Sequence, residues 1–279
     1  MIDLDQLIVK AYDLEPLPAS VTRLSALVAD NNSQLNEIVE VLTYDPALTA
    51  GILRSANSAA SASHTAISNV KDAVLRMGLG TVLSLAVAAS VKRNMILALP
   101  EYGLRENELW RHSVLSSLSV EAIQAHSKVQ IQPDAFTAAL LHDIGKLVLS
   151  RFLDADVQYI MQLAHDEGRL ETPAAESEIL GVNHGEVGGL MAQHWKLPES
   201  IVRGISYHHN PAECGDTICY VVALANLTAH RIADKTSDDQ GLLPPKKYLE
   251  RLSLTTESFE KVCETASKRM DDVQRRYNA

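Results

Sequence analysis

The segment Ala139-Leu140-Leu141-His142-Asp143-Ile144-Gly145-Lys146 places a histidine and an aspartate inside an apolar run that is typical of a buried helix. Burying these two polar side chains is costly unless each has a hydrogen-bond partner or binds a metal ion. Neighbouring side chains on a helix diverge by about 100°, so His142 and Asp143 cannot easily chelate one ion from the same side. From these residues alone, a hydrogen-bonded pair that fixes helix packing and a metal site are equally good interpretations.

Helical spacing of apolar residues continues on both sides of this segment, and no segment alternates with a period of two. Asp45-Pro46 marks a helix start, because aspartate can accept hydrogen bonds from first-turn amides and proline fits the first helical position. Gly78 and Gly80 divide the run 70–91 into two helices that meet at 77–80. The sequence thus predicts an all-α protein, with further helices at about 21–28, 35–42, 45–57, 105–127, 134–152, 155–167, 173–180, 184–195, 198–207 and 215–234.

Two breaks interrupt this pattern. The clearest one is Pro100 to Gly103, and the polar segment 234–245, which ends in Pro244-Pro245, is predicted to be a linker. The last segment, 248–276, is amphipathic and rich in charge. We therefore expect it to pack on the outside of the protein or to fray.

The composition excludes several classes of protein. Of the 279 residues, 46% are hydrophobic and 22% are charged, which rules out a disordered chain. The net charge is -10, and the sequence shows no cluster of Lys and Arg that would form a basic face. Because nucleic-acid binding depends on such residues to neutralise phosphates, we expect none here. The most apolar stretch, 81–91, is too short to cross a bilayer, and the N-terminus lacks the pattern of a signal peptide. Together with an odd number of cysteines, these features predict a soluble, cytoplasmic protein without membrane contact.

Several histidines stand at positions that bear on a metal site. Glu108 and His112 are four residues apart and share a helix face, although such a pair alone is more often a solvated face. His184 follows a Gly-Val-Asn turn, and His208-His209 lies near the end of another predicted helix. Imidazole nitrogens together with carboxylate oxygens suit zinc, iron, manganese or nickel.

The remaining histidines and two neighbouring cysteines are interpreted as structural. Cys214 and Cys219 match no common zinc spacing and are predicted to be buried thiols. The other histidines are assigned to surface or core positions: His64, His126, His165, His194 and His230.

The order of the motifs in the second half of the chain is distinctive. They are Leu109-Trp110-Arg111-His112-Ser113, then 141–146, Gly181-Val182-Asn183-His184, Trp195-Lys196-Leu197-Pro198 and His208-His209. This order resembles the HDOD family of bacterial signalling modules, which are related to HD-type metal phosphohydrolases and HD-GYP phosphodiesterases. Leu17-Pro18, Asp45-Pro46-Ala47-Leu48-Thr49 and Asn57-Ser58 resemble the N-terminal signature of the same family.

The resemblance implies a domain organisation as well as an all-helical fold. An HDOD domain would span 14–235, with an N-terminal helical part at 14–100 packed on an HD-like bundle at 105–235. Residues 1–13 would be an extension, and 236–279 a linker and a C-terminal helix.

The resemblance also implies a set of site residues. In HD-GYP relatives, a Glu and a His four residues apart, the His-Asp pair, a later His and a His-His pair hold two or three metal ions. The matching metal ligands here are Glu108, His112, His142, Asp143, His184, His208 and His209. We expect one metal position at His112, His142, Asp143 and His208, and a second at Glu108, His184 and His209. Asp143 and Lys146 are implied as catalytic residues, with Lys146 contacting a phosphate.

Two positions depart from the family pattern. The aspartate that commonly closes an HD site should fall near 225–227, where Asn226 stands, and an amide is a poorer ligand than a carboxylate. Asn210-Pro211-Ala212-Glu213 replaces the glycine-tyrosine-proline signature that follows the paired histidines in cyclic-dinucleotide phosphodiesterases.

The resemblance leaves two functions open. The first is a regulatory signal-transduction module that retains an HD-type metal site and binds a signalling protein partner or a small phosphorylated ligand. The second is a metal-dependent phosphohydrolase of phosphomonoesters or nucleotide phosphodiesters. In either case we expect one or two divalent transition-metal ions, with iron or manganese preferred over zinc or nickel.

Overall fold

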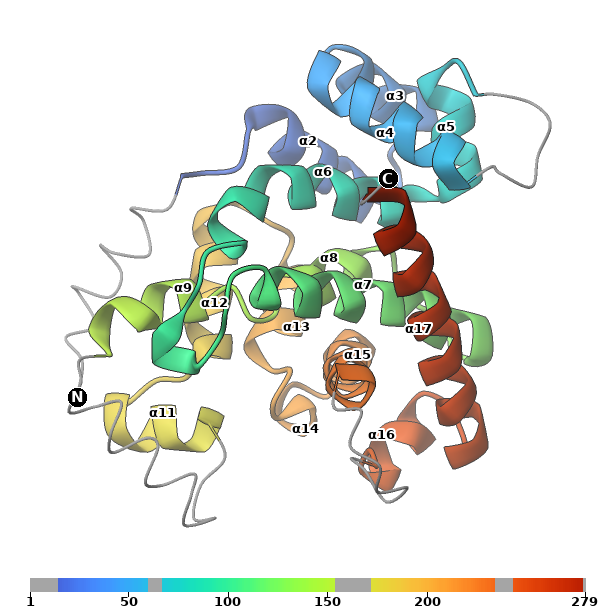
Figure 1. The fold of residues 1–279 in the computed structure, drawn as a ribbon. Helices are drawn as coiled ribbons and strands as arrows, with labels where there is room; N and C mark the ends of the chain where they lie inside the picture. The colour runs from blue at the N-terminus through green and yellow to red at the C-terminus, as the bar shows by residue number, and fades with distance from the viewer. Residues whose placement is uncertain (1–14, 60–66, 154–171, 234–242, 278–279) are drawn as a thin grey trace.

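Figure 1 shows a computed structural model of the chain, which describes residues 15–59, 67–153, 172–233 and 243–277. The described residues form helices joined by turns, and their one β pairing is an isolated bridge between Leu99 and Leu104. The all-α prediction is therefore confirmed. No single helix in the described ranges combines the length and the apolar character needed to cross a membrane; α5 and α6 pass that test only as a bent pair.

The N-terminal helices are α2 (Ala19–Ala29), α3 (Leu35–Thr43), α4 (Pro46–Ala59) and α5 (Val70–Met77), of which α3 to α5 gather at one end of the molecule (Figure 1). The predicted cap at the start of α4 is confirmed. Asp45 Oδ1 accepts hydrogen bonds from the amides of Ala47 and Leu48, at 3.0 and 3.1 Å. Its other oxygen accepts from Ser20 Oγ and so ties α4 to α2.

The predicted corner at 77–80 is also confirmed. The axes of α5 and α6 (Leu79–Met95) differ by 110°, and Gly78 between them has a φ of 78° that favours glycine. A Cβ on Gly80 would lie 2.8 Å from the Phe136 ring and 2.9 Å from the Pro133 carbonyl oxygen. A glycine is therefore needed for α6 to pack against the following half of the chain.

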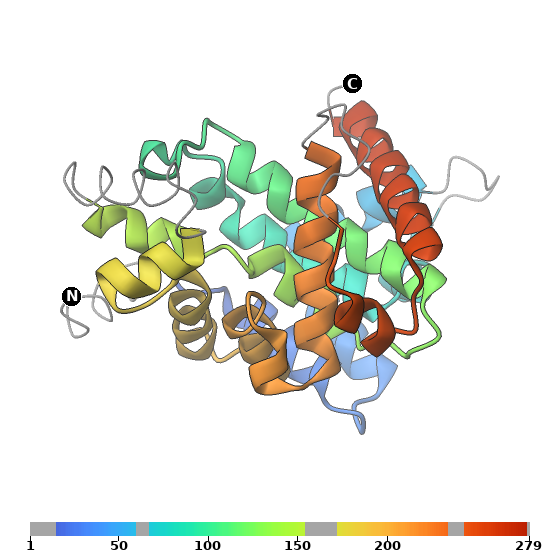
Figure 2. The same ribbon diagram turned by 90° about the horizontal axis from the view of Figure 1, so that it is seen from below.

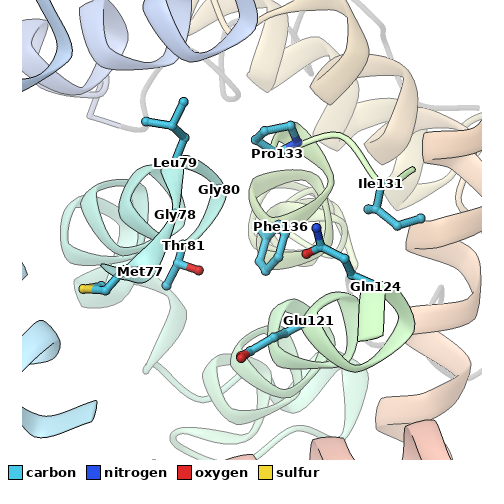
Figure 3. Close-up of a pocket in the computed structure, with 10 residues that line it drawn as sticks. All are labelled: Met77, Gly78, Leu79, Gly80, Thr81, Glu121, Gln124, Ile131, Pro133 and Phe136. Atoms are coloured by element: carbon cyan, nitrogen blue, oxygen red, sulfur yellow. The ribbon is translucent and has the colours of Figure 1, made fainter. Parts of the chain in front are cut away.

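A cavity of about 260 Å³ lies beside this corner, and Figure 3 shows its lining. Leu79 and Thr81 from the first turn of α6 face Pro133 and Phe136, and Glu121 and Gln124 of α7 complete the wall. None of the histidines predicted as metal ligands lines it.

The second half begins with a short 3-10 turn, Pro100–Tyr102, labelled η1. The helices that follow are α7 (Glu108–His126), α8 (Asp134–Leu141), α9 (Lys146–Leu149), α11 (Thr172–Leu180), α12 (His184–His194), α13 (Glu199–Ser206), α14 (Pro211–Cys214) and α15 (Thr217–Ala233). Helix α15 packs against α7, α8 and α13, as Figure 2 shows from below. This bundle holds most of the predicted ligands.

One predicted helix is broken where the His-Asp pair stands. Instead of a continuous helix over 134–152, the chain turns tightly at 142–145 before α9 and a 3-10 turn at Ser150–Phe152. The Ile144 amide donates to the Leu141 carbonyl at 2.9 Å, and the Lys146 amide to the Asp143 carbonyl at 3.1 Å. The helix predicted at 155–167 and most of the predicted linker lie outside the described residues.

The C-terminal segment follows the first of the two expected alternatives, because its described residues form helices that pack on the outside of the bundle. It forms two helices, α16 (Lys246–Arg251) and α17 (Thr256–Tyr277), and α17 packs across α7 (Figure 1). Phe259 and Val262 of α17 are fully buried. Because its apolar residues recur at 259, 262, 263, 266 and 270, one face of this charged helix still belongs to the core.

Candidate metal centre

Among the residues that the structure describes, the side chains that could bind metal form two groups. The first contains His112, His142 and Asp143, and the second contains His184, His208 and His209. Within each group the potential ligand atoms lie within 4.8 Å of one another. Six of the seven predicted ligands are thus brought together from α7, α12 and the turns that follow α8 and α13.

The first group joins α7 to the turn after α8. His112 Nε2 lies 3.2 Å from His142 Nε2 and 3.6 Å from Asp143 Oδ2. His142 Nε2 lies 3.5 Å from the same carboxylate oxygen. The tight turn at 142–145 lets adjacent side chains converge, which a regular helix would hinder.

The second group lies beside the first and shares Asp143 with it. His184 Nε2 lies 2.8 Å from His209 Nε2 and 3.1 Å from Asp143 Oδ1. The His208 ring centroid is 3.8 Å from that of His209 and 4.9 Å from that of His142. His208, which is predicted to share a metal with His112, thus lies between the two groups: its ligand atom falls with those of His184 and His209, and its ring also lies beside that of His142. Asp143 connects the two groups.

Backbone carbonyls fix the orientation of two of these imidazoles. His142 Nδ1 lies 2.8 Å from the Ala139 carbonyl oxygen, and His208 Nδ1 lies 2.7 Å from that of Ile205. If each Nδ1 donates its proton there, each Nε2 keeps a lone pair, as in metal-binding histidines. His208 Nε2 is buried and has no hydrogen-bond partner in the described part of the chain. This donor set fits a divalent metal ion.

A buried carboxylate that the sequence analysis missed orients His184. Glu176 Oε2 accepts from His184 Nδ1 at 2.7 Å and from the His184 amide at 2.8 Å. Its other oxygen accepts from the Tyr102 hydroxyl at 2.8 Å. Glu176 is one of two glutamates on α11, and nothing in the local sequence separates it from the exposed Glu178. The one sequence feature that pointed to Glu176 is its place on the helix that directly precedes the candidate ligand His184.

Glycine allows the two groups to approach each other. A Cβ on Gly145 would lie 2.0 Å from the His184 carbonyl oxygen and 2.7 Å from the Gly188 amide nitrogen. The start of α9 therefore packs directly on the first turn of α12, which brings Asp143 next to His184. Asn183 caps α12 by accepting from the amides of Gly185 and Glu186.

The remaining predicted residues are placed differently. Lys146 Nζ lies 2.7 Å from Asp143 Oδ2, at the first group. Asn226 Oδ1 lies 3.0 Å from His112 Nε2, which agrees with its predicted place at the closing position. Glu108 accepts a hydrogen bond from the Arg105 amide at 2.8 Å, and no hydrogen bond or ion pair among the described residues joins it to the two groups.

Burial and local charge set the protonation of the cluster. Burial raises the pKa of Asp143, but Lys146 and the neighbouring histidines outweigh it and hold this pKa well below its usual range. Burial lowers the pKa of His112, His142 and His208, and lowers that of His209 to about 2.

His184 behaves in the opposite way. Burial lowers its pKa and Lys146 adds to this effect, but the carboxylates of Glu176 and Asp143 outweigh both and raise it. In the metal-free protein the cluster thus holds an ionised carboxylate and mostly neutral imidazoles. These are the protonation states that metal ions require of such ligands.

Comparisons with known proteins agree with this architecture. Residues 14–211 match the sequence model of the HDOD domain. A Shewanella amazonensis protein, provisionally described as a phosphohydrolase, superposes with a TM-score of 0.69 at 24% identity, covering 95% of this chain and 97% of that one. An HDOD domain protein of unknown function from Geobacter sulfurreducens superposes with a TM-score of 0.65 at 20% identity, covering 97% of each chain.

Two longer relatives also match. A Marinobacter aquaeolei protein, provisionally described as a signal transduction protein, superposes with a TM-score of 0.71 at 21% identity, covering 98% of this chain and 60% of that one. An uncharacterised protein of Treponema pallidum is 25% identical over 235 residues, which are 82% of this chain and 44% of that protein. The chain thus spans less than half the length of that relative. The solved structures share the fold, and the match over 14–211 shows that this chain belongs to the HDOD domain family.

Proposed function

We propose that this chain is a metal-binding signal-transduction module in which the two histidine groups hold one or two divalent ions. The observation that carries the proposal is His208 Nε2, a buried nitrogen without a hydrogen-bond partner among the described residues, beside the rings of His142, His184 and His209. An unsatisfied buried polar atom costs about 1–3 kcal/mol, and a metal ion at this position would offset that cost. The mixed nitrogen and oxygen ligands suit iron, manganese, zinc or nickel. Of these we propose iron or manganese, in line with the family resemblance.

A regulatory role agrees better with the charge of the site than catalysis does. Asn226 supplies a neutral amide at His112, and Glu108 is engaged by the Arg105 amide instead of the cluster. The site therefore has fewer carboxylates to hold metal than the family resemblance implies. In this proposal, a small phosphorylated ligand or a protein partner binds at the metal centre. Helix α15 carries Asn226 and packs on α7, α8 and α13. A shift of α15 on ligand binding would therefore alter the packing of these three helices.

Metal analysis of the purified protein tests this proposal. We expect at least one equivalent of iron or manganese per chain, and we expect His208→Ala to lose most of it. His126→Ala is the matched control, because His126 lies in the last turn of α7 and contacts Thr265 instead of the cluster. A wild-type protein without bound transition metal, even after incubation with iron or manganese, would contradict the proposal.

A second candidate function is metal-dependent phosphoester hydrolysis. It is favoured by Asp143, whose two carboxylate oxygens contact the two histidine groups, and by Lys146, whose ammonium lies 2.7 Å from that carboxylate. A bound divalent ion would lower the pKa of a water molecule and stabilise charge on phosphoryl oxygens. Asp143 would remain ionised and hold both groups in place, while Lys146 would offset negative charge on the phosphoryl group.

Hydrolysis assays separate the two candidates. The metal-loaded protein would be assayed with a generic phosphodiester, nucleotides and cyclic dinucleotides in the presence of manganese or iron. Turnover that disappears in Asp143→Asn and falls in Lys146→Ala would establish the enzyme. A metal-loaded protein that turns over none of them would support the regulatory module.

A further inference from the structure

His230 lies at the edge of the metal centre, although the sequence analysis assigned it to a structural position. It stands one helical turn after Asn226 on α15, so the two side chains share a helix face. Its ring centroid is 4.5 Å from that of His112, with an angle of 44° between the ring planes. The face of α15 that closes the site thus presents an amide followed by an imidazole.

The first group is partly exposed at His112. The His112 side chain is 15% exposed, whereas those of His142 and Asp143 are 0% and 3% exposed. His230 itself is exposed. A ligand that contacts the exposed part of His112 would lie near the His230 ring, because the two ring centroids are 4.5 Å apart. Lys146, also 15% exposed, offers its ammonium at the same group.

The groups near the exposed part of His112 suit an anion. Lys146 is a cation, Asn226 is neutral where the resemblance implies a carboxylate, and His230 adds a ring with an N–H donor. With an aspartate at 226, the α15 face would instead repel an oxyanion. His230 belongs to neither metal-binding group, so its place beside His112 is interpreted as a contact to a bound ligand and not as a metal ligand.

We propose that His230 is a ligand-contacting residue, which donates a hydrogen bond to an oxyanion, such as a phosphate group, held at the metal centre. This inference rests on the proposed function, since it requires a metal-loaded site. The competing role is ring packing alone, in which His230 only holds the imidazole of His112 in position.

Two substitutions distinguish the contact from packing. His230→Phe keeps an aromatic ring against His112 but removes the N–H donor, whereas His230→Gln loses the ring and keeps a donor. The probe is inorganic phosphate, titrated calorimetrically into manganese-loaded protein, with bound manganese measured on the same samples. We expect His230→Phe to retain its manganese and to bind phosphate about tenfold more weakly, because a hydrogen bond to a charged group is lost. His230→Gln should bind phosphate close to wild type.

Each other outcome has a definite meaning. Equal phosphate affinity in wild type and His230→Phe would overturn the inference, as would a metal-loaded wild type that binds no phosphate. Loss of manganese from His230→Phe would also overturn it, because the ring would then serve the metal site itself. A wild type that binds no metal would instead contradict the proposed function.

Discussion

A single carboxylate determines which nitrogen of His184 faces the candidate metal centre. Glu176 is fully buried and accepts two hydrogen bonds from His184, one from the ring and one from the backbone amide. Tyr102 satisfies its second oxygen and fixes its orientation. Because Glu176 holds Nδ1, Nε2 is the nitrogen that faces His209 and Asp143, and such a carboxylate increases the basicity of a metal-binding imidazole.

Glu176→Gln is therefore expected to weaken metal binding by about 10–100-fold, the usual effect of removing a partner of a metal-binding histidine. The affinity would be measured by competition of manganese against a chelating dye. Glu178→Gln is the matched control, since it removes an exposed carboxylate from the same helix. Equal affinity in the two variants would show that Glu176 does not position His184 for metal.

Gly145 is the residue at which the absence of a side chain matters most. In Gly145→Ala the new Cβ would meet the His184 backbone, which cannot move away as a flexible side chain can. We expect a loss of at least about 1–3 kcal/mol in the free energy of unfolding, measured with urea. Gly51→Ala is the control, because its Cβ would meet nothing within 4 Å inside α4, and it should stabilise by about 0.5–1 kcal/mol. A Gly145→Ala variant with an unchanged free energy of unfolding would contradict this account of how α9 packs on α12.

At the level of elements, α17 shows that charge content is a poor guide to helix placement. Its charged residues line the outer face, and Arg269 forms an ion pair with Glu121 of α7. Its apolar face buries Phe259 against the bundle. The helix is therefore part of the core of the described structure, although it lies beyond the residues that match the HDOD domain.

Phe259→Ala is expected to lower the free energy of unfolding by about 3–5 kcal/mol, as is usual for a fully buried aromatic side chain. Lys268→Ala, at an exposed position on the same helix, should change it by no more than about 0.5 kcal/mol. Both values would come from urea unfolding curves. Similar curves for the two variants would mean that α17 does not contribute its buried face to stability.

At the level of the whole molecule, the histidine cluster links stability to pH. Four imidazoles, those of His112, His142, His208 and His209, have pKa values lowered by burial. Below the unfolded value of about 6.5, the unfolded chain takes up protons that the folded protein excludes. Stability is thus fully present above that pH and is lost as the pH falls. His184, with a raised pKa, acts in the opposite direction.

The metal-free protein is therefore expected to lose stability between about pH 7.5 and pH 5.5, by up to about 1.4 kcal/mol per pH unit for each neutral imidazole. Urea midpoints of chelator-treated protein across this range would measure the slope. His208→Gln, which removes one such group, should make the slope shallower. A slope near zero in the wild type would show that the cluster is not held neutral.

The sequence alone determined the features that depend on neighbouring residues. Asp45 caps α4 and Gly78 forms a corner because a cap and a left-handed turn are decided within a few positions of chain. The order of the motifs also predicted that the six dispersed side chains of the two groups lie close together, because the family that the chain resembles implies one common site for them. The predicted domain boundaries at 100–105 and 235 stay predictions.

Tertiary structure alone decided which side chains meet across the bundle. Tyr102 and Glu176 are 74 residues apart, and His112 and Asn226 are 114 residues apart. Glu176 and His230 carry no periodic or local signal, so their places beside His184 and His112 follow only from how α11 and α15 pack. Tertiary packing also places His208 next to His184 and packs α17 against α7. Such contacts depend on burial shared between distant segments, whereas a pattern in the chain reports only what adjacent residues favour.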